Sequence, residues 1–146
     1  MSLYQFLASD KKLESYDNQR IVLDRKNKIL KGKEGKQRIF DIDEQSAMRI
    51  YQEEDRKYVD LYTDKKYAAY IEWRYNEENV PILMEYIKQH LESARRIELW
   101  NVWLGPKEEV KKSACSIEEL SIQNIKNIWG KEEFIYPECL TVYKMR

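Results

Sequence analysis

The chain has 146 residues with 26 basic and 26 acidic side chains, so its formal net charge is zero. This balance excludes a nucleic-acid binder that works through bulk positive charge, because such proteins carry a basic excess that neutralises phosphates. Aromatic residues make up 12% of the chain, which excludes intrinsic disorder, since disordered chains are poor in them. The length predicts one domain covering residues 1–146.

The first third of the chain is predicted to form strands and turns. A short apolar and aromatic run covers residues 3–8. Two short segments at 21–23 and 28–30 flank residues of turn composition, which predicts a hairpin. Residues 37–42 are predicted as a further strand, whereas the alternation at 47–52 is compatible with a strand or with a short helix.

Two strands are predicted in the middle of the chain, at 57–63 and 67–75, joined by a turn at 64–66. Their side chains alternate with a period of two, which is typical of a strand with one buried face. We expect the two strands to form an antiparallel hairpin. In the first strand Val59 and Leu61 are expected to face the core. The outward face then carries Tyr58, Asp60 and Tyr62.

From residue 80 the apolar period changes to that of an amphipathic helix. Asn79 is the predicted N-cap, because Pro81 then lies in the first turn, where its missing N–H costs no hydrogen bond. The apolar stripe comprises Val80, Leu83, Met84, Ile87, Leu91 and Ala94.

A strand at 97–104 follows, with apolar side chains on both faces, and is the best candidate for a central strand covered on both sides. The charged stretch 106–114 is predicted to be a loop. Ser116 and Glu119 have the spacing of a capping box and predict the start of a second helix, which Gly130 ends. The apolar side of this helix comprises Ile122, Ile125, Ile128 and Trp129.

A final strand at 139–143 completes the order of strands, helix, strand, helix, strand. This order predicts an α+β fold, a mixed and mostly antiparallel sheet with two helices packed on one face. No apolar run approaches the roughly 18 residues that a membrane span needs. The first twelve residues lack the features of a secretory signal. We therefore expect a cytoplasmic protein without a membrane partner.

No residue pattern predicts a catalytic centre, a metal site or a cofactor. Cys115 and Cys139 have no partner Cys or His nearby, so neither a disulfide framework nor a zinc site is predicted. A phosphate-binding loop and a Gly-x-Ser-x-Gly nucleophile elbow are both missing. His90 lies near the edge of a helical apolar stripe, where a packed side chain is more common than a catalyst.

The aromatic residues leave a small-molecule pocket open as an alternative. Trp100 and Trp103 lie on opposite faces of the strand at 97–104, so one of them could reach the far side of the sheet. Such a pocket would be lined by Trp100 or Trp103. Its reactive group would be His90, or else Cys115, whose pKa a helix N-terminus could lower.

Charge is segregated along the first half of the chain. Residues 25–38 hold seven bases and one acid, which indicates either a solvated hairpin whose lysines protect strand edges or an RNA-contact surface. Nucleic acid is the less favoured partner, because no aromatic residue lies among these bases to stack on nucleobases. Residues 41–64 hold eight acids against three bases.

The acidic stretch also bears tyrosines, which are enriched in protein interfaces. It is either an ordinary solvent face or a surface for a basic partner protein. The predicted partner-binding residues are Tyr51, Tyr58, Asp60 and Tyr62.

Four segments resemble a group of small uncharacterised bacterial proteins: 4–9 (Tyr-Gln-Phe-Leu-Ala-Ser), 67–75, 97–105 and 116–122. The resemblance implies no activity. In size and arrangement the chain also resembles, by analogy, the α+β immunity proteins of bacterial toxin systems. The leading hypothesis is a non-enzymatic module that binds another protein, as an inhibitor or immunity-type partner. The alternative is a small-molecule-binding protein or enzyme with an aromatic pocket.

Overall fold

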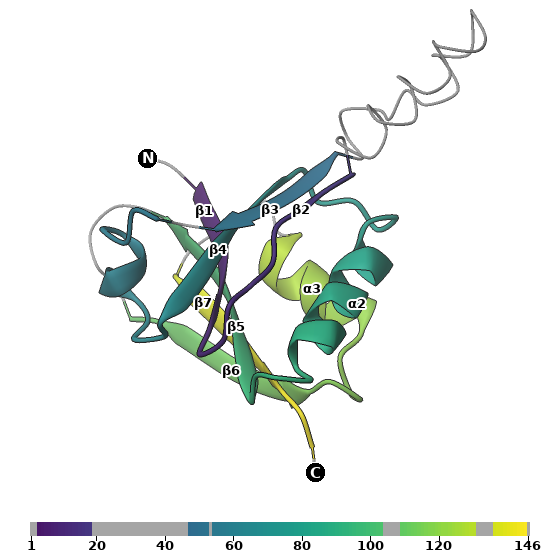
Figure 1. The fold of residues 1–146 in the computed structure, drawn as a ribbon. Coiled ribbons are helices and arrows are strands. Elements are labelled where there is room, and N and C mark those ends of the chain that lie inside the picture. The colour runs from purple at the N-terminus through teal and green to yellow at the C-terminus, as the bar shows by residue number, and fades with distance from the viewer. Residues whose placement is uncertain (1–2, 19–46, 53, 104–108, 131–135, 146) are drawn as a thin grey trace, which may run out of the picture.

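The computed structural model describes residues 3–18, 47–52, 54–103, 109–130 and 136–145. Seven strands among these residues form one sheet in the order β2-β3-β4-β1-β5-β7-β6, and two neighbouring α-helices lie beside it (Figure 1). The strands are β1 (Leu3–Ser9), β2 (Tyr16–Asp17), β3 (Met48–Gln52), β4 (Tyr67–Trp73), β5 (Arg96–Trp103), β6 (Lys111–Ser116) and β7 (Glu138–Tyr143). The helices in this described part of the chain are α2 (Val80–His90) and α3 (Ile122–Trp129), and a turn of 3-10 helix covers Val59–Leu61.

The predicted α+β class is confirmed. Each strand pairing is antiparallel except that of β6 with β7, which is parallel, so the sheet is mixed and mostly antiparallel. The strands predicted at 67–75, 97–104 and 139–143 correspond to β4, β5 and β7, and residues 48–52 form a strand rather than a short helix. The hairpin predicted at 21–30, the strand predicted at 37–42 and the basic stretch 25–38 lie outside the described residues.

The strand predicted at 57–63 is wrong. Val59–Leu61 forms a 3-10 turn, in which the N–H of Tyr62 donates to the Val59 carbonyl at 3.0 Å. The guanidinium of Arg56 holds the turn closed, because it donates to Asp60 and to the carbonyls of two residues that precede β4. As a result β4 does not pair with this segment, and its neighbours in the sheet are β3 and β1.

The loop predicted over 106–114 is wrong from Lys111 onward. Lys111–Ser116 forms β6, which pairs with β7 at the edge of the sheet. The first four residues of β6 are exposed, so this strand shows no apolar alternation. Charged side chains such as Lys111 and Lys112 are common on edge strands, where they discourage pairing with other chains.

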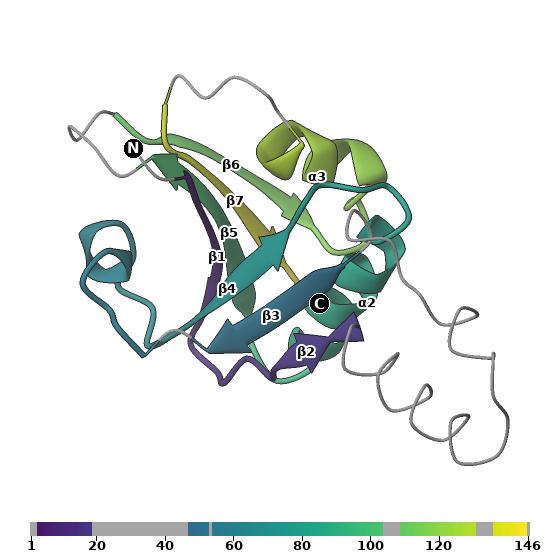
Figure 2. The same cartoon turned by 90° about the horizontal axis from the view of Figure 1, so that it is seen from above.

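Buried side chains form two clusters, and neighbouring residues of β1 and β5 alternate between them. Leu7 and Leu99 belong to the first core cluster, together with buried residues of α2 and α3. Phe6 and Trp100 belong to the second core cluster. Leu99 is fully buried and Trp100 is 2% exposed, which confirms the prediction that this strand is covered on both sides (Figure 2).

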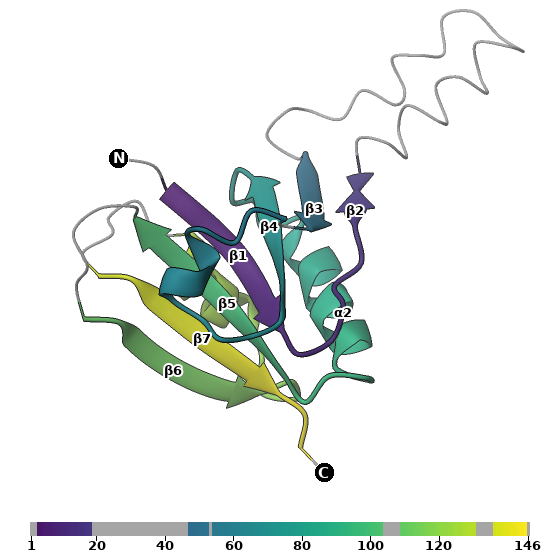
Figure 3. The same cartoon turned by 60° about the vertical axis from the view of Figure 1, so that its left-hand side comes forward.

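The second core cluster contains several aromatic rings and is covered by the segment around the 3-10 turn. Figure 3 shows that turn lying across β1 and β5. The ring of Tyr58 lies 6.0 Å from that of Tyr4, and the ring of Tyr62 lies 5.7 Å from that of Trp100, between centroids. The buried members of this cluster are Tyr4, Phe6, Ala8, Val59, Ala68, Trp100, Val102 and Cys139.

Two capping motifs in succession lead into α3. Ser116 and Glu119 exchange hydrogen bonds as predicted, but they close a single turn after β6 rather than starting the helix. The N-cap of α3 is Ser121, whose hydroxyl accepts from the N–H of Asn124 while the Asn124 side chain accepts from the N–H of Ser121. The helix ends at Gly130, as the sequence predicts.

Candidate functional site

The four residues predicted to bind a partner do not share a flat strand face. The rings of Tyr58 and Tyr62 are half-buried against the second core cluster, and Tyr51 lies in β3, with its ring 5.5 Å from that of Tyr70. Asp60 is exposed and pairs with Arg56 at 2.9 Å. Residues three apart, such as Val59 and Tyr62, face inward in a 3-10 turn, and the apolar residue of the turn that is left exposed, at 56%, is Leu61.

His90 links α2 to the segment between β1 and β2. The N–H of Glu14 donates to Nε2 at 3.0 Å, so Nε2 is unprotonated and Nδ1 donates to the carbonyl of Tyr86 at 2.8 Å. The ring of Tyr86 stacks on the imidazole at 4.0 Å between centroids, and its hydroxyl donates to the Glu14 carbonyl. Burial raises the pKa of the Tyr86 hydroxyl. Both ring nitrogens of His90 therefore have structural roles.

The two thiols are held in their protonated form. Burial raises the pKa of Cys139 to about 12. The pKa of Cys115 is raised by burial and by the carboxylate of Glu119. A helix N-terminus does not lower the Cys115 pKa, because this residue lies in β6 and α3 begins only at Ile122. Since the thiolate is the nucleophilic form, both residues are poor nucleophiles near neutral pH.

The two cysteines should differ in their reaction with iodoacetamide. In mildly alkaline buffer we expect Cys115, which is partly exposed, to be alkylated slowly, while Cys139 stays unmodified until the protein is unfolded in urea. Mass spectrometry of tryptic peptides over time measures both rates. If Cys139 were alkylated in the folded protein as fast as Cys115, its side chain would not be buried as the structure shows.

Three of the hollows that described residues line contain none of the residues predicted to form an aromatic pocket. Their volumes are about 630 Å³ between α2 and α3, about 530 Å³ at one end of the sheet, and about 410 Å³ between α3 and strands β6 and β7. Trp100 is packed in the second core cluster, and the side chain of Trp103 lies outside the described part of the chain. His90 and Cys115 line none of the three.

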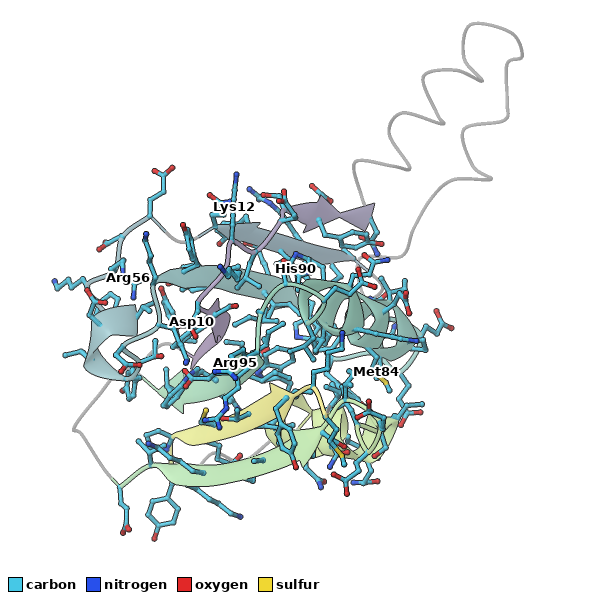
Figure 4. The ribbon with its side chains drawn as sticks, turned by 60° about the horizontal axis from the view of Figure 1, so that its bottom comes forward. Asp10, Lys12, Arg56, Met84, His90 and Arg95 are labelled. Carbon is cyan, nitrogen blue, oxygen red and sulfur yellow. The ribbon has the colours of Figure 1, made fainter. Side chains whose placement is uncertain are left out.

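The largest of these hollows, the α2/α3 groove, is built from one stripe of α2. The stripe consists of Pro81, Met84, Glu85 and Lys88, whose i, i+3, i+4, i+7 spacing aligns them on one side of the helix. It runs beside the buried stripe that includes Leu83 and Ile87. Figure 4 shows Met84 on the side of α2 that faces α3.

The opposite wall of the α2/α3 groove is set by the two capping motifs. The Ser116–Glu119 turn places Ile117 and Glu118 in the wall. The capping box at Ser121 places Ile122 at the first position of α3, also in the wall. The sequence indicates Ile122 as part of the buried side of its helix, but it is 43% exposed. That exposure is what leaves the groove open to solvent.

The α2/α3 groove is apolar along its floor and more acidic than basic at its rim. Glu85 and Glu118 line it against one base, Lys88. Glu77, just before α2, forms an ion pair with Lys126 of α3 at 4.0 Å. Both partners of that pair are more than half exposed, so it contributes little to stability. These side chains give the groove a hydrophobic floor with a slight negative excess.

No helix in the described part of the chain is long and apolar enough to span a membrane. Among the same residues, no group of three or more His, Cys, Asp or Glu side chains is placed to hold a metal ion. Comparison of the chain with protein-family models, with curated proteins and with solved structures gave no match. The resemblance to small bacterial proteins stays a prediction.

Proposed function

We propose that the protein is a non-enzymatic binding module that holds a segment of another protein in the α2/α3 groove. The observation that carries this proposal is the hollow of about 630 Å³ in which Met84, Ile117 and Ile122 remain open between two helices. The class of function is the one that the sequence predicts. The surface differs from the predicted one, because Tyr58 and Tyr62 are engaged with the second core cluster.

Exposed apolar side chains gathered beside two helices are typical of protein-interaction sites. An isolated exposed residue needs no explanation, but apolar residues that line one hollow offer a partner side chain a place to bury. Ile82, at 38% exposure, adds apolar surface on α2 beside the groove. Grooves between helices commonly accept an amphipathic helix that inserts apolar anchors.

The charges at the rim indicate the chemistry of the partner segment. Glu85 and Glu118 at the rim favour a partner that carries lysine or arginine beside its apolar anchors. The exposed Glu78 near the start of α2 adds to the negative potential on this side of the protein. The occupant that fits is therefore a short amphipathic segment of another protein, apolar on one side and basic on the other. An inhibitor or immunity-type role would fit such binding.

A small-molecule or catalytic function has less support. The groups proposed for an aromatic pocket do not form one site. Trp100 packs in the core, His90 links two segments, and Cys115 has a raised pKa. RNA contact through residues 25–38 stays a prediction, because those residues lie outside the described part of the chain.

A helix-forming peptide of leucine and lysine, with leucines at helical i, i+3, i+4 and i+7 positions, tests the proposal. We expect Ile122→Lys to weaken binding of the labelled peptide by about tenfold or more, because it places a charge in the groove and repels the lysines. The matched control is Leu61→Lys, which adds the same charge to an exposed apolar residue of the 3-10 turn that does not line the groove. Fluorescence anisotropy measures both affinities.

A second peptide, with every lysine replaced by glutamate, tests the sign of the rim charge. The wild-type protein should bind the lysine peptide more tightly than the glutamate peptide. If the two protein variants Ile122→Lys and Leu61→Lys bound the lysine peptide with equal affinity, or if the wild-type protein did not bind it, the groove would be rejected as the binding site.

A further inference from the structure

A cationic hollow of about 530 Å³ lies at one end of the sheet, away from the α2/α3 groove. The register of the strands explains why its residues meet. Ser9, the last residue of β1, pairs with Tyr67 of β4 and with Ile97 of β5, and Arg96 pairs with Tyr143 of β7. The residues just beyond these last pairs therefore gather at the same end. The lining residues are Asp10, Lys65, Arg95, Arg96, Tyr143 and Lys144.

The lining has a strong positive excess. Four cationic side chains face one carboxylate, that of Asp10, which is a formal excess of three positive charges. Lys65 forms an ion pair with Asp10, since its Nζ lies 3.2 Å from Asp10 Oδ2. Among the described residues no ion pair engages Arg95, Arg96 or Lys144. Figure 4 shows Asp10 and Arg95 close to each other near the middle of the view.

Two adjacent arginines suit phosphate in particular. The guanidinium presents several N–H donors in a rigid fork that matches a phosphate group, and such charge-assisted hydrogen bonds are about twice as strong as neutral ones. An excess of three charges is more than a single phosphate needs. The half-buried ring of Tyr143 supplies an apolar surface at the same place for an organic part of the ligand.

We propose that this hollow binds a small molecule carrying a diphosphate group. Its volume lies within the range of about 300–1,000 Å³ that is usual for small-molecule sites. Nucleic acid is a poorer fit, because its backbone is recognised along an extended basic face rather than in one hollow. The site shares no residue with the α2/α3 groove, so it adds a ligand to the protein-binding function and does not depend on it.

Isothermal titration calorimetry with inorganic pyrophosphate, adenosine diphosphate and orthophosphate tests the proposal on the full chain. We expect pyrophosphate to bind at least about tenfold more tightly than orthophosphate, because it engages more of the cations. Adenosine diphosphate binding more tightly than pyrophosphate would assign the natural ligand as an organic diphosphate packed on Tyr143. Equal affinities would assign the diphosphate group alone.

The double variant Arg95→Gln/Arg96→Gln should lose at least about tenfold in affinity for pyrophosphate, since it removes both guanidinium groups. The control Arg74→Gln removes one exposed arginine at the opposite end of β4 from Lys65 and should bind like the wild type. Circular dichroism checks that both variants are folded.

Three results would overturn the proposal. One is the absence of binding to either diphosphate below about 1 mM. Another is a double variant that is folded and binds pyrophosphate like the wild type. The third is a single-stranded RNA that binds more tightly than both diphosphates and loses its affinity in the double variant, which would make this end of the sheet a nucleic-acid surface.

Discussion

Replacing Trp100 by alanine is expected to lower the free energy of unfolding by about 3–5 kcal/mol. The indole is 2% exposed, its ring stacks on Phe6 at 5.9 Å between centroids, and its N–H donates to Glu98 at 2.9 Å. The substitution leaves a cavity beneath Tyr62 and removes one of the two hydrogen bonds that Glu98 Oε1 accepts, the other coming from Thr63. Urea denaturation followed by circular dichroism measures the loss.

The control for this experiment lies in the segment that covers the same cluster. Leu61 is 56% exposed at the 3-10 turn, so Leu61→Ala should change stability by no more than about 0.5 kcal/mol. If Trp100→Ala cost no more than Leu61→Ala, the second core cluster would not be a packed layer. The placement of Tyr58 and Tyr62 against it would then be wrong as well.

Trp129→Ala should have an effect of similar size, about 3–5 kcal/mol, by loosening α3 from the sheet. Trp129 is 2% exposed, its ring meets that of Trp73 edge to face at 6.0 Å, and its indole N–H donates to the Trp100 carbonyl at 3.0 Å. One residue earlier, the Ile128 carbonyl accepts a buried hydrogen bond from Asn101 at 2.7 Å. These contacts fix the end of α3, whose first residue lines the α2/α3 groove.

Thermal and urea unfolding of two further variants separate the contribution of the Trp129 ring from that of its indole hydrogen bond. Trp129→Phe keeps an aromatic ring but loses the hydrogen bond, so we expect a smaller loss than for alanine, about 1–3 kcal/mol. Ile122→Ala, on the same helix but 43% exposed, should change stability little. A loss for Trp129→Ala no larger than that for Ile122→Ala would mean that α3 is not held by its C-terminal end.

Regular periodicity in the sequence was sufficient to predict the interior of the fold. In β5 both faces are apolar, and Leu99 and Trp100 are buried on opposite sides. The helical stripe from Val80 predicts α2, and Gly130 predicts the end of α3. These elements are predictable because each has a buried face that repeats at the period of its own backbone geometry.

The errors fall where that periodicity is absent or ambiguous. The short segment around Val59–Leu61 satisfies a strand pattern and a 3-10 turn equally well, and the hydrogen bonds of Arg56 favour the turn. An edge strand such as β6 buries little, so its sequence resembles a charged loop. The 3-10 turn depends on hydrogen bonds between Arg56 and nearby residues that a periodic pattern does not reveal, and β6 depends on pairing with β7, which is distant in the sequence.

Neither the α2/α3 groove nor the cationic hollow could be predicted from sequence pattern. Ile122 belongs to an apolar stripe by its spacing, and only the arrangement of α2 beside α3 leaves it open to solvent. Lys65, Arg95 and Lys144 are separated along the chain and meet only because the strand register brings their ends together. The sequence shows which residue types are present, but not which residues the fold brings next to one another.

The proposal that the α2/α3 groove binds a protein segment is tested most directly by mapping the site of binding. Backbone amide chemical shifts of the isotope-labelled protein can be followed by NMR during titration with the leucine–lysine peptide. We expect the largest shift changes at Met84, Ile117 and Ile122, the residues that line the groove. Changes confined to the 3-10 turn or to the cationic hollow, with the groove unaffected, would contradict the proposed function.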